Sequence, residues 1–249
     1  MMQYVIVIQS AYTDPELSAR RLEISQHTSI ASLRTQTHKP TIHLQLSYHD
    51  PLAENRIHAY QTTGCEVRPI WREDWKLYRE NWELPEGRKI VGRLDDDDVL
   101  AFDFCEKTHH CGANSEGEMA LLWPNGHVFW RQCLFNLSHR GNQFVSLLTD
   151  QMTDPHQIGH WLYCKTWKTR VVSHEPGWIW CRHGDAATST LKRYRQEHVK
   201  RIDAERFRIN LRAIQRALDA SGQPSGNYHE HKRPDTLQRV LEDNKRYAR

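Results

Sequence analysis

The stretch Lys89-Ile90-Val91-Gly92-Arg93-Leu94-Asp95-Asp96-Asp97-Asp98-Val99-Leu100 combines the pattern of a buried strand with four consecutive carboxylates. Its apolar residues predict a strand over 89–94 and a second packed segment after the aspartates. Four unpaired carboxylates repel one another, so such a turn needs cationic partners. Oxygen-only ligands favour a hard divalent cation, Mg²⁺ or Mn²⁺. A solvated acidic turn is the alternative interpretation of the same residues.

The first hundred residues alternate strand and helix patterns. Apolar runs predict strands at 4–9, 41–46 and 66–70, before the acidic strand. Asp14-Pro15 and Asp50-Pro51 each place a helix N-cap beside a proline, so we expect helices through about residues 25 and 62, with a further helix at 29–37. Strands that alternate with helices form parallel sheets, whose carboxyl edges carry ligand sites. The expected fold is therefore α/β with a mostly parallel central sheet.

The second half of the chain has a different pattern. Two strands are predicted at 119–123 and 127–132, joined by a turn at 124–126, then a helix at 142–152 and strands at 161–167, 171–172 and 178–181. Residues 190–220 mix apolar and basic positions, which predicts one or two amphipathic helices. Their basic face is either solvated or docked on an anionic membrane surface. We expect a main domain over 1–188 and a C-terminal helical extension and tail over 189–249.

Composition limits the function classes. A chain of 249 residues with a net charge of +3 is too weakly basic to indicate a nucleic-acid partner, and acidic residues interrupt the basic C-terminal face. No apolar run reaches the roughly 18 residues of a membrane span, and the first residues lack the pattern of a signal peptide. We expect a cytoplasmic protein, and if the basic face docks on a membrane, the surface is the inner membrane face. The six scattered cysteines are expected to be reduced thiols.

Three segments resemble a known family in order and spacing. Gly92 to Leu100 is similar to a segment R-L-D-x-D-D-A-L, and Gly141-Asn142-Gln143-Phe144-Val145-Ser146-Leu147 is similar to G-N-x-F-x-S-L. Trp178 to Asp185 is similar to a Trp-rich strand that ends in an H-G-x-N turn, with Asp185 in place of Asn. These segments resemble the rhamnosyltransferase family of GT-A-type glycosyltransferases over about residues 1–190. The chain departs from the family at 9–13, where the family carries Thr-Arg-Phe.

The resemblance implies a metal-dependent glycosyltransferase. The donor would be a nucleotide-diphosphate sugar, with rhamnose as the candidate sugar, and the acceptor a glycan or another hydroxyl compound. A late histidine, His183, would complete the metal coordination as a neutral imidazole, and nitrogen among oxygens favours Mn²⁺ over Mg²⁺. The expected metal residues are Asp95, Asp97, Asp98 and His183. The expected donor-binding residues are Gln9, Ser10, Arg93 and Asp95.

Other roles have more than one candidate. An inverting transfer needs a general base, and His139 and Asp150 are the candidates. The aromatic-rich segment 71–82 is either an acceptor-binding flap or part of the core. Alternation along the chain points Asp96 away from its acidic neighbours, toward solvent or a structural partner. Two further functions are a metal-dependent phosphoesterase or nuclease and a non-catalytic binding module of the same fold.

Overall fold

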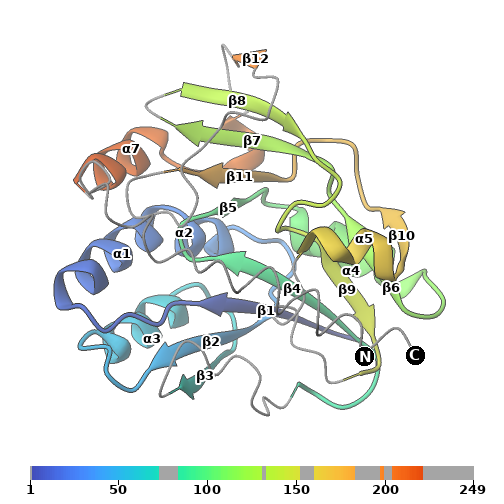
Figure 1. The fold of residues 1–249 in the computed structure, drawn as a ribbon, viewed down its shortest axis with the longest axis horizontal. Coiled ribbons are helices and arrows are strands. Elements are labelled where there is room, and N and C mark those ends of the chain that lie inside the picture. The colour runs from blue at the N-terminus through green and yellow to red at the C-terminus, as the bar shows by residue number, and fades with distance from the viewer. Residues whose placement is uncertain are drawn as a thin grey trace, which may run out of the picture.

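The computed structural model describes residues 2–72, 84–130, 133–151, 160–182, 197–198 and 204–220. In these ranges the chain forms two β-sheets flanked by helices (Figure 1). Several features predicted from the sequence fall outside them, namely His183 and the turn after it, the aromatic-rich segment after residue 72, and most of the C-terminal extension and tail over 189–249.

The larger sheet has the order β10-β6-β9-β4-β1-β2-β3 within the described residues. Its parallel half consists of β1 (Gln3–Gln9), β2 (Thr41–Ser47), β3 (Val67–Arg72) and β4 (Lys89–Asp95). The other half consists of β9 (Ser146–Thr149), which is antiparallel to β4 and β6, and the parallel pair β6 (Met119–Leu122) and β10 (Lys168–Val171). The prediction of an α/β fold with a mostly parallel central sheet is confirmed.

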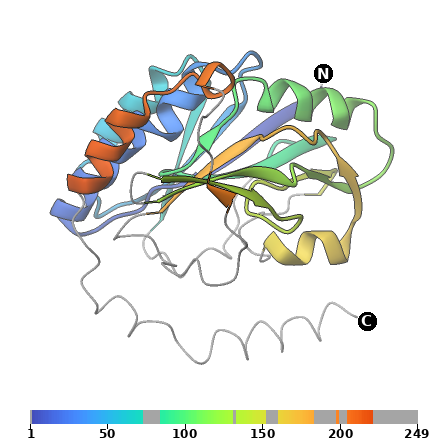
Figure 2. The same ribbon diagram turned by 90° about the horizontal axis from the view of Figure 1, so that it is seen from above.

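Helices cover this sheet on both faces, because successive strand residues point to opposite sides. One face packs against α2 (Ser29–Arg34), α3 (Ala53–Gln61) and α4 (Phe104–Ala113). The helix α5 (His160–Thr166, yellow) lies on the other side of the sheet from α4 (green) in Figure 2. The helix α1 (Pro15–His27) begins as predicted, since the Asp14 side chain accepts from the Leu17 N–H at 2.7 Å and Pro15 is the first helical residue.

A smaller sheet lies beside the first, with the order β12-β8-β7-β11-β5 in the part of the chain that the structure describes. Its strands are β5 (Val99–Leu100), β7 (Asn125–Trp130), β8 (Cys133–Ser138), β11 (Trp178–Cys181) and β12 (Glu197–His198). Because β4 ends at Asp95 and β5 begins at Val99, the acidic turn connects the two sheets (Figure 1).

Three predicted elements are wrong. The strands β6 and β7 do not form a hairpin, because β7 pairs with β8 in the smaller sheet. The segment 142–152 contains the strand β9 and not a helix, since its short apolar run is buried on both faces and has no distinguishing period. The segment 161–167 is helical, and Tyr163 contacts Trp167 four residues later, with ring centroids 5.4 Å apart.

The apolar face of the last described helix, which lies in the C-terminal amphipathic segment, is buried within the protein. The helix α7 (Leu211–Ala220) follows the short helix α6 (Ala204–Phe207) and contacts α1. Its residues Ile214, Ala217 and Leu218 are buried in one cluster with Ile24 of α1. Internal packing thus accounts for the amphipathic pattern of α7. None of the described helices combines the length and apolar composition needed to cross a membrane.

His43 of β2 makes stability depend on pH. Its side chain is 2% exposed, and burial, together with the neighbouring Arg68, lowers the pKa of His43 to about 4. The folded state therefore favours the neutral imidazole, and its stability is complete above the unfolded pKa of about 6.5 and falls with decreasing pH. We expect the His43 contribution to lower the free energy of unfolding by about 2–3 kcal/mol between pH 7 and pH 4.5. Urea unfolding of wild type and His43→Leu at both pH values measures it, and an equal pH dependence of the two proteins would contradict it.

Candidate functional site

The acidic turn lies at the carboxyl edge of the parallel strands. Asp95 is the last residue of β4, and the Asp98 N–H donates to the Asp95 carbonyl at 3.1 Å. Carboxylate oxygens of Asp95, Asp97 and Asp98 all lie within 4.8 Å of one another. Asp95 is half-buried, whereas Asp97 and Asp98 are 8% and 0% exposed. A single turn thus brings three carboxylates together, as the sequence analysis expects.

Asp98 anchors this turn to the smaller sheet. Its two oxygens accept from the Cys181 N–H of β11 at 2.9 Å and from Nε2 of Gln143 at 3.2 Å. Burial, followed by the charges of Asp97 and Asp95, raises the pKa of Asp98 well above its usual range. Among the described residues no cationic side chain forms an ion pair with Asp98. A cation that joined the cluster would act in the opposite direction and favour the charged carboxylate of Asp98.

Arg21 of α1 neutralises the other side of the turn. Its Nη1 lies 2.8 Å from Oδ2 of Asp97, and its Nη2 pairs with Asp96. Burial acts to lower the pKa of Arg21, but the carboxylates of Asp96 and Asp97 more than offset it, so the net pKa is raised. Asp96 also accepts from the hydroxyls of Ser10 and Tyr12, each at 2.8 Å. Of the two expectations for Asp96, solvent or a structural partner, the structure shows the second, since Asp96 contacts Arg21, Ser10 and Tyr12.

Arg93 holds the first carboxylate of the cluster. Its Nε and Nη2 lie 2.9 and 2.8 Å from the same oxygen of Asp95. Burial opposes the charge on Arg93, yet the adjacent Asp95 raises the net pKa of the guanidinium above its ordinary value. The pair is about a quarter exposed, so Arg93 lies at the mouth of the site and keeps donors for an incoming anion.

The two predicted donor-binding residues of β1 differ in how they are placed. Gln9 is half-buried and lies in register with Asp95. Ser10 is fully buried, and its hydroxyl donates to Asp96, so it shapes the turn from behind. Gln9 is therefore the one whose side chain can reach a ligand at this edge.

Of the two predicted general bases, His139 and Asp150, Asp150 lies far from the acidic turn. Asp150 follows β9, and its carbonyl accepts from Nζ of Lys89 at 3.1 Å, at the amino end of β4. Asp95 is six residues further along that strand, about 20 Å away, so Asp150 cannot exchange a proton with a group at the acidic turn. His139 directly follows β8, and its N–H donates to the Pro124 carbonyl at 2.7 Å.

A second histidine, His160, lies near His139. Its Nδ1 is 2.6 Å from the Gly141 carbonyl, so Nδ1 carries the proton in the neutral ring. Burial lowers the pKa of His160, and the charges of Arg93, Asp95 and His139 also act on it, which places all three near the ring. His160 is not among the residues predicted from the sequence, since a strand was expected directly after it, over 161–167, whereas His160 lies in the first turn of α5.

His183 lies outside the described residues, as stated above. The strand that leads to it is described, and its last residue, Cys181, donates its N–H to Asp98. The end of β11 thus lies directly against the acidic cluster.

The residues present fit a divalent cation. The guanidinium groups of Arg21 and Arg93 pair with Asp96, Asp97 and Asp95 of the turn. The clustered donors are all oxygen, the ligand type that Mg²⁺ and Mn²⁺ prefer. Burial and the neighbouring carboxylates disfavour the charge of Asp98, and a cation at this position would offset that cost.

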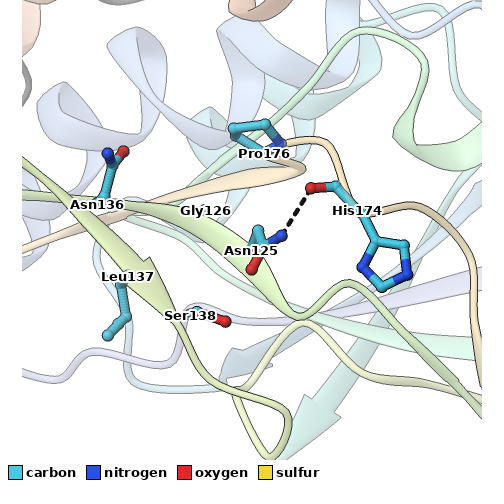
Figure 3. Close-up of a pocket in the computed structure, with 7 residues that line it drawn as sticks. All are labelled: Asn125, Gly126, Asn136, Leu137, Ser138, His174 and Pro176. Atoms are coloured by element: carbon cyan, nitrogen blue, oxygen red, sulfur yellow. Dashed lines mark hydrogen bonds between the residues drawn. The ribbon is translucent and has the colours of Figure 1, made fainter.

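A separate cavity of about 410 Å³ opens over β7 and β8. Figure 3 shows its lining, in which the Asn125 amide donates to the His174 carbonyl at 2.6 Å. Cys181, beside the acidic turn, is in register with Phe129, four residues along β7 from Asn125. Four residues of a strand span about 13 Å, so the cavity at Asn125 is not part of the acidic site.

Neither protein-family models nor curated proteins match the chain. Solved structures with similarity include the TarS fragment 1–349 of S. aureus, at 9% identity and a TM-score of 0.43, over 72% of this chain and 60% of that one. A protein of Desulfovibrio desulfuricans G20, named as a nucleotide-diphospho-sugar transferase, has 12% identity and a TM-score of 0.43. The match covers 88% of this chain and 96% of that protein. The 4-diphosphocytidyl-2C-methyl-D-erythritol synthase of Anaerococcus prevotii DSM 20548 has 10% identity and a TM-score of 0.37. The match covers 68% of this chain and 88% of that enzyme. The chain spans 60% of the TarS fragment.

Proposed function

We propose that the protein is a metal-dependent glycosyltransferase that moves a sugar from a nucleotide-diphosphate donor to a hydroxyl acceptor. The observation that carries this proposal is the cluster of Asp95, Asp97 and Asp98 at the carboxyl edge of the parallel strands. Ligands bind at that edge of open α/β sheets. Clustered carboxylate oxygens suit a hard divalent cation, and a cation bound there would attract a diphosphate.

Asp95 and Asp97 would hold the metal, because Asp98 has both oxygens engaged by Cys181 and Gln143 and is placed to orient the turn. When bound there, Mn²⁺ or Mg²⁺ would supply a Lewis acid that stabilises the charge developing on a diphosphate leaving group. Arg93 adds a guanidinium at the mouth of the site, where it can pair with a phosphate oxygen. We retain His183 as a further ligand on the basis of the sequence resemblance.

The acceptor hydroxyl must lose a proton as the glycosidic bond forms. His139 and His160 are the candidate bases, because the charges of Asp95 and His139 both act on the His160 ring and burial lowers the pKa of each imidazole. A neutral imidazole at pH 7 can accept the proton. We propose rhamnose as the transferred sugar on the resemblance alone.

A phosphoesterase or nuclease that uses two metal ions is the second candidate. Such sites draw carboxylates from several strands, whereas three carboxylates of this site come from one turn. Under this alternative the protein would cleave a model phosphodiester and would not consume nucleotide sugars. A non-catalytic binding module would do neither.

Release of nucleoside diphosphate from a panel of nucleotide sugars tests the proposed function. We expect slow hydrolysis of one or a few donors that requires Mn²⁺ or Mg²⁺ and stops with a chelator. His160→Asn and His139→Asn, assayed separately with an acceptor, should identify the base as the variant whose turnover falls about 100-fold while nucleotide affinity stays unchanged. If no nucleotide sugar is bound or hydrolysed with either metal, the proposed function is wrong.

A further inference from the structure

The charge of the chain is divided unevenly along its length. Residues 190–249 contain 15 lysines and arginines against 8 aspartates and glutamates, whereas residues 1–189 contain 19 against 23. The small net charge of +3 therefore combines a basic C-terminal part with an acidic remainder. Such an asymmetry is typical of chains whose basic part contacts an anionic partner.

The outer face of α7 displays part of this basic charge. Its apolar face packs against α1, whereas Arg212 and Arg216 are exposed and, four residues apart, lie on one side of the helix. Arg208, which precedes α7, is also exposed, and its guanidinium lies over the Phe102 ring, 4.1 Å from the centroid. Among the described residues no carboxylate forms an ion pair with any of these three arginines.

Arg206 of α6 fixes this segment to the rest of the fold. Its Nε donates to the Pro176 carbonyl at 2.6 Å, and its other nitrogens lie 3.1 Å from Asp103 and 3.0 Å from Glu175. Its own carbonyl accepts from the Phe102 N–H at 2.9 Å. The two nearby carboxylates are thus engaged by Arg206, and the arginines on the outer face remain available to a partner.

We propose that the outer face of α7 docks the protein on an anionic lipid bilayer. The contact is electrostatic, because Tyr48, after β2, is the one large apolar side chain that is exposed among the described residues. Glu205 and Asp219 interrupt the basic face. A bilayer tolerates such interruptions, since its field acts over a Debye length of about 10 Å and averages neighbouring charges. Nucleic acid binding relies instead on contacts to individual phosphates.

Sedimentation with vesicles of equal parts phosphatidylcholine and phosphatidylglycerol, with a chelator present, tests the docking. We expect the wild type to bind at about 0.1 M salt and to be released at about 1 M, where the Debye length falls to about 3 Å. The double variant Arg212→Gln with Arg216→Gln should bind about 10- to 30-fold more weakly, at about 1 kcal/mol for each basic residue near the surface. Both side chains are exposed, so its melting temperature should stay close to that of the wild type.

Two matched variants serve as controls. Lys165→Gln with Lys168→Gln removes the same charge from exposed positions of α5 and β10, which lie on the opposite side of the molecule from α7 (Figures 1 and 2). This variant should bind the vesicles within about twofold of the wild type, because its lysines lie beyond a Debye length of about 10 Å from the docked face. Arg212→Lys with Arg216→Lys keeps the charge and should bind like the wild type, since a bilayer attracts either cation.

Several results would overturn this inference. They are a wild type that does not bind the anionic vesicles, equal binding to vesicles of phosphatidylcholine alone, unchanged binding of the arginine-to-glutamine variant, and an equal loss in the lysine-to-glutamine control. Tighter binding of single-stranded oligodeoxythymidylate than of the vesicles at the same salt would assign the face to nucleic acid instead. The measurements need neither a metal nor a nucleotide sugar, so a negative result leaves the proposed function standing.

Discussion

Replacing Asp97 by asparagine is expected to lower metal-dependent sugar transfer by at least about 100-fold, because a Lewis acid at this position contributes several kcal/mol to the stability of the transition state. Asparagine keeps the size of the side chain and removes the charge that a divalent cation needs. Arg21 retains its contact with Asp96, so the turn should keep its fold. Mn²⁺ titration by calorimetry and initial rates of nucleoside diphosphate release measure the two effects.

Asp150→Asn is the control for Asp97→Asn. Asp150 is an exposed aspartate at the amino end of β4, about 20 Å from Asp95, and its carbonyl, not its carboxylate, contacts Lys89. We expect wild-type metal affinity and rate for this variant. Unchanged Mn²⁺ affinity in a folded Asp97→Asn protein would contradict the assignment of the acidic turn as the metal site.

The parallel half of the fold could be predicted because its signals are local. Asp14 beside Pro15 caps α1 through its own side chain, and β1 and β2 are continuous apolar runs. The segments that failed, 142–152 and 161–167, have short apolar runs without a clear period, so only tertiary packing decides their state. The smaller sheet was not predictable, because β11 pairs with β5 and β7 from distant parts of the chain.

The residues of the candidate site could likewise be predicted from the sequence only in part. The clustering of Asp95, Asp97 and Asp98 follows from their shared turn, and the sequence predicts it. The contact of Arg21 with that turn joins residues 75 or more positions apart, and no periodicity reveals it.

The second large effect concerns the fold behind the site. Arg56 of α3 and Asp50 form an ion pair at 2.8 Å, and both side chains are 0% exposed. Arg56→Met leaves the Asp50 carboxylate buried without its cation, so we expect a loss of about 3–5 kcal/mol in the free energy of unfolding. Arg68→Met removes the cation of the exposed pair with Glu66 and should cost about 1 kcal/mol or less. Urea unfolding at pH 7 measures both, and similar losses for the two variants would contradict the prediction.

The double variant Arg56→Met with Asp50→Asn separates the ion pair from the packing around it. Asparagine removes the second charge and can still accept from the Ser18 hydroxyl and the Leu52 N–H, as Asp50 does. We therefore expect it to regain at least about 2 kcal/mol over Arg56→Met, a non-additive result. Arg56 also lies over the Tyr12 ring, 4.8 Å from its centroid, and Tyr12 donates to Asp96 of the acidic turn. A double variant that regains stability but binds Mn²⁺ about 10-fold more weakly would assign Arg56 to positioning the turn, whereas full recovery of both would restrict it to the fold.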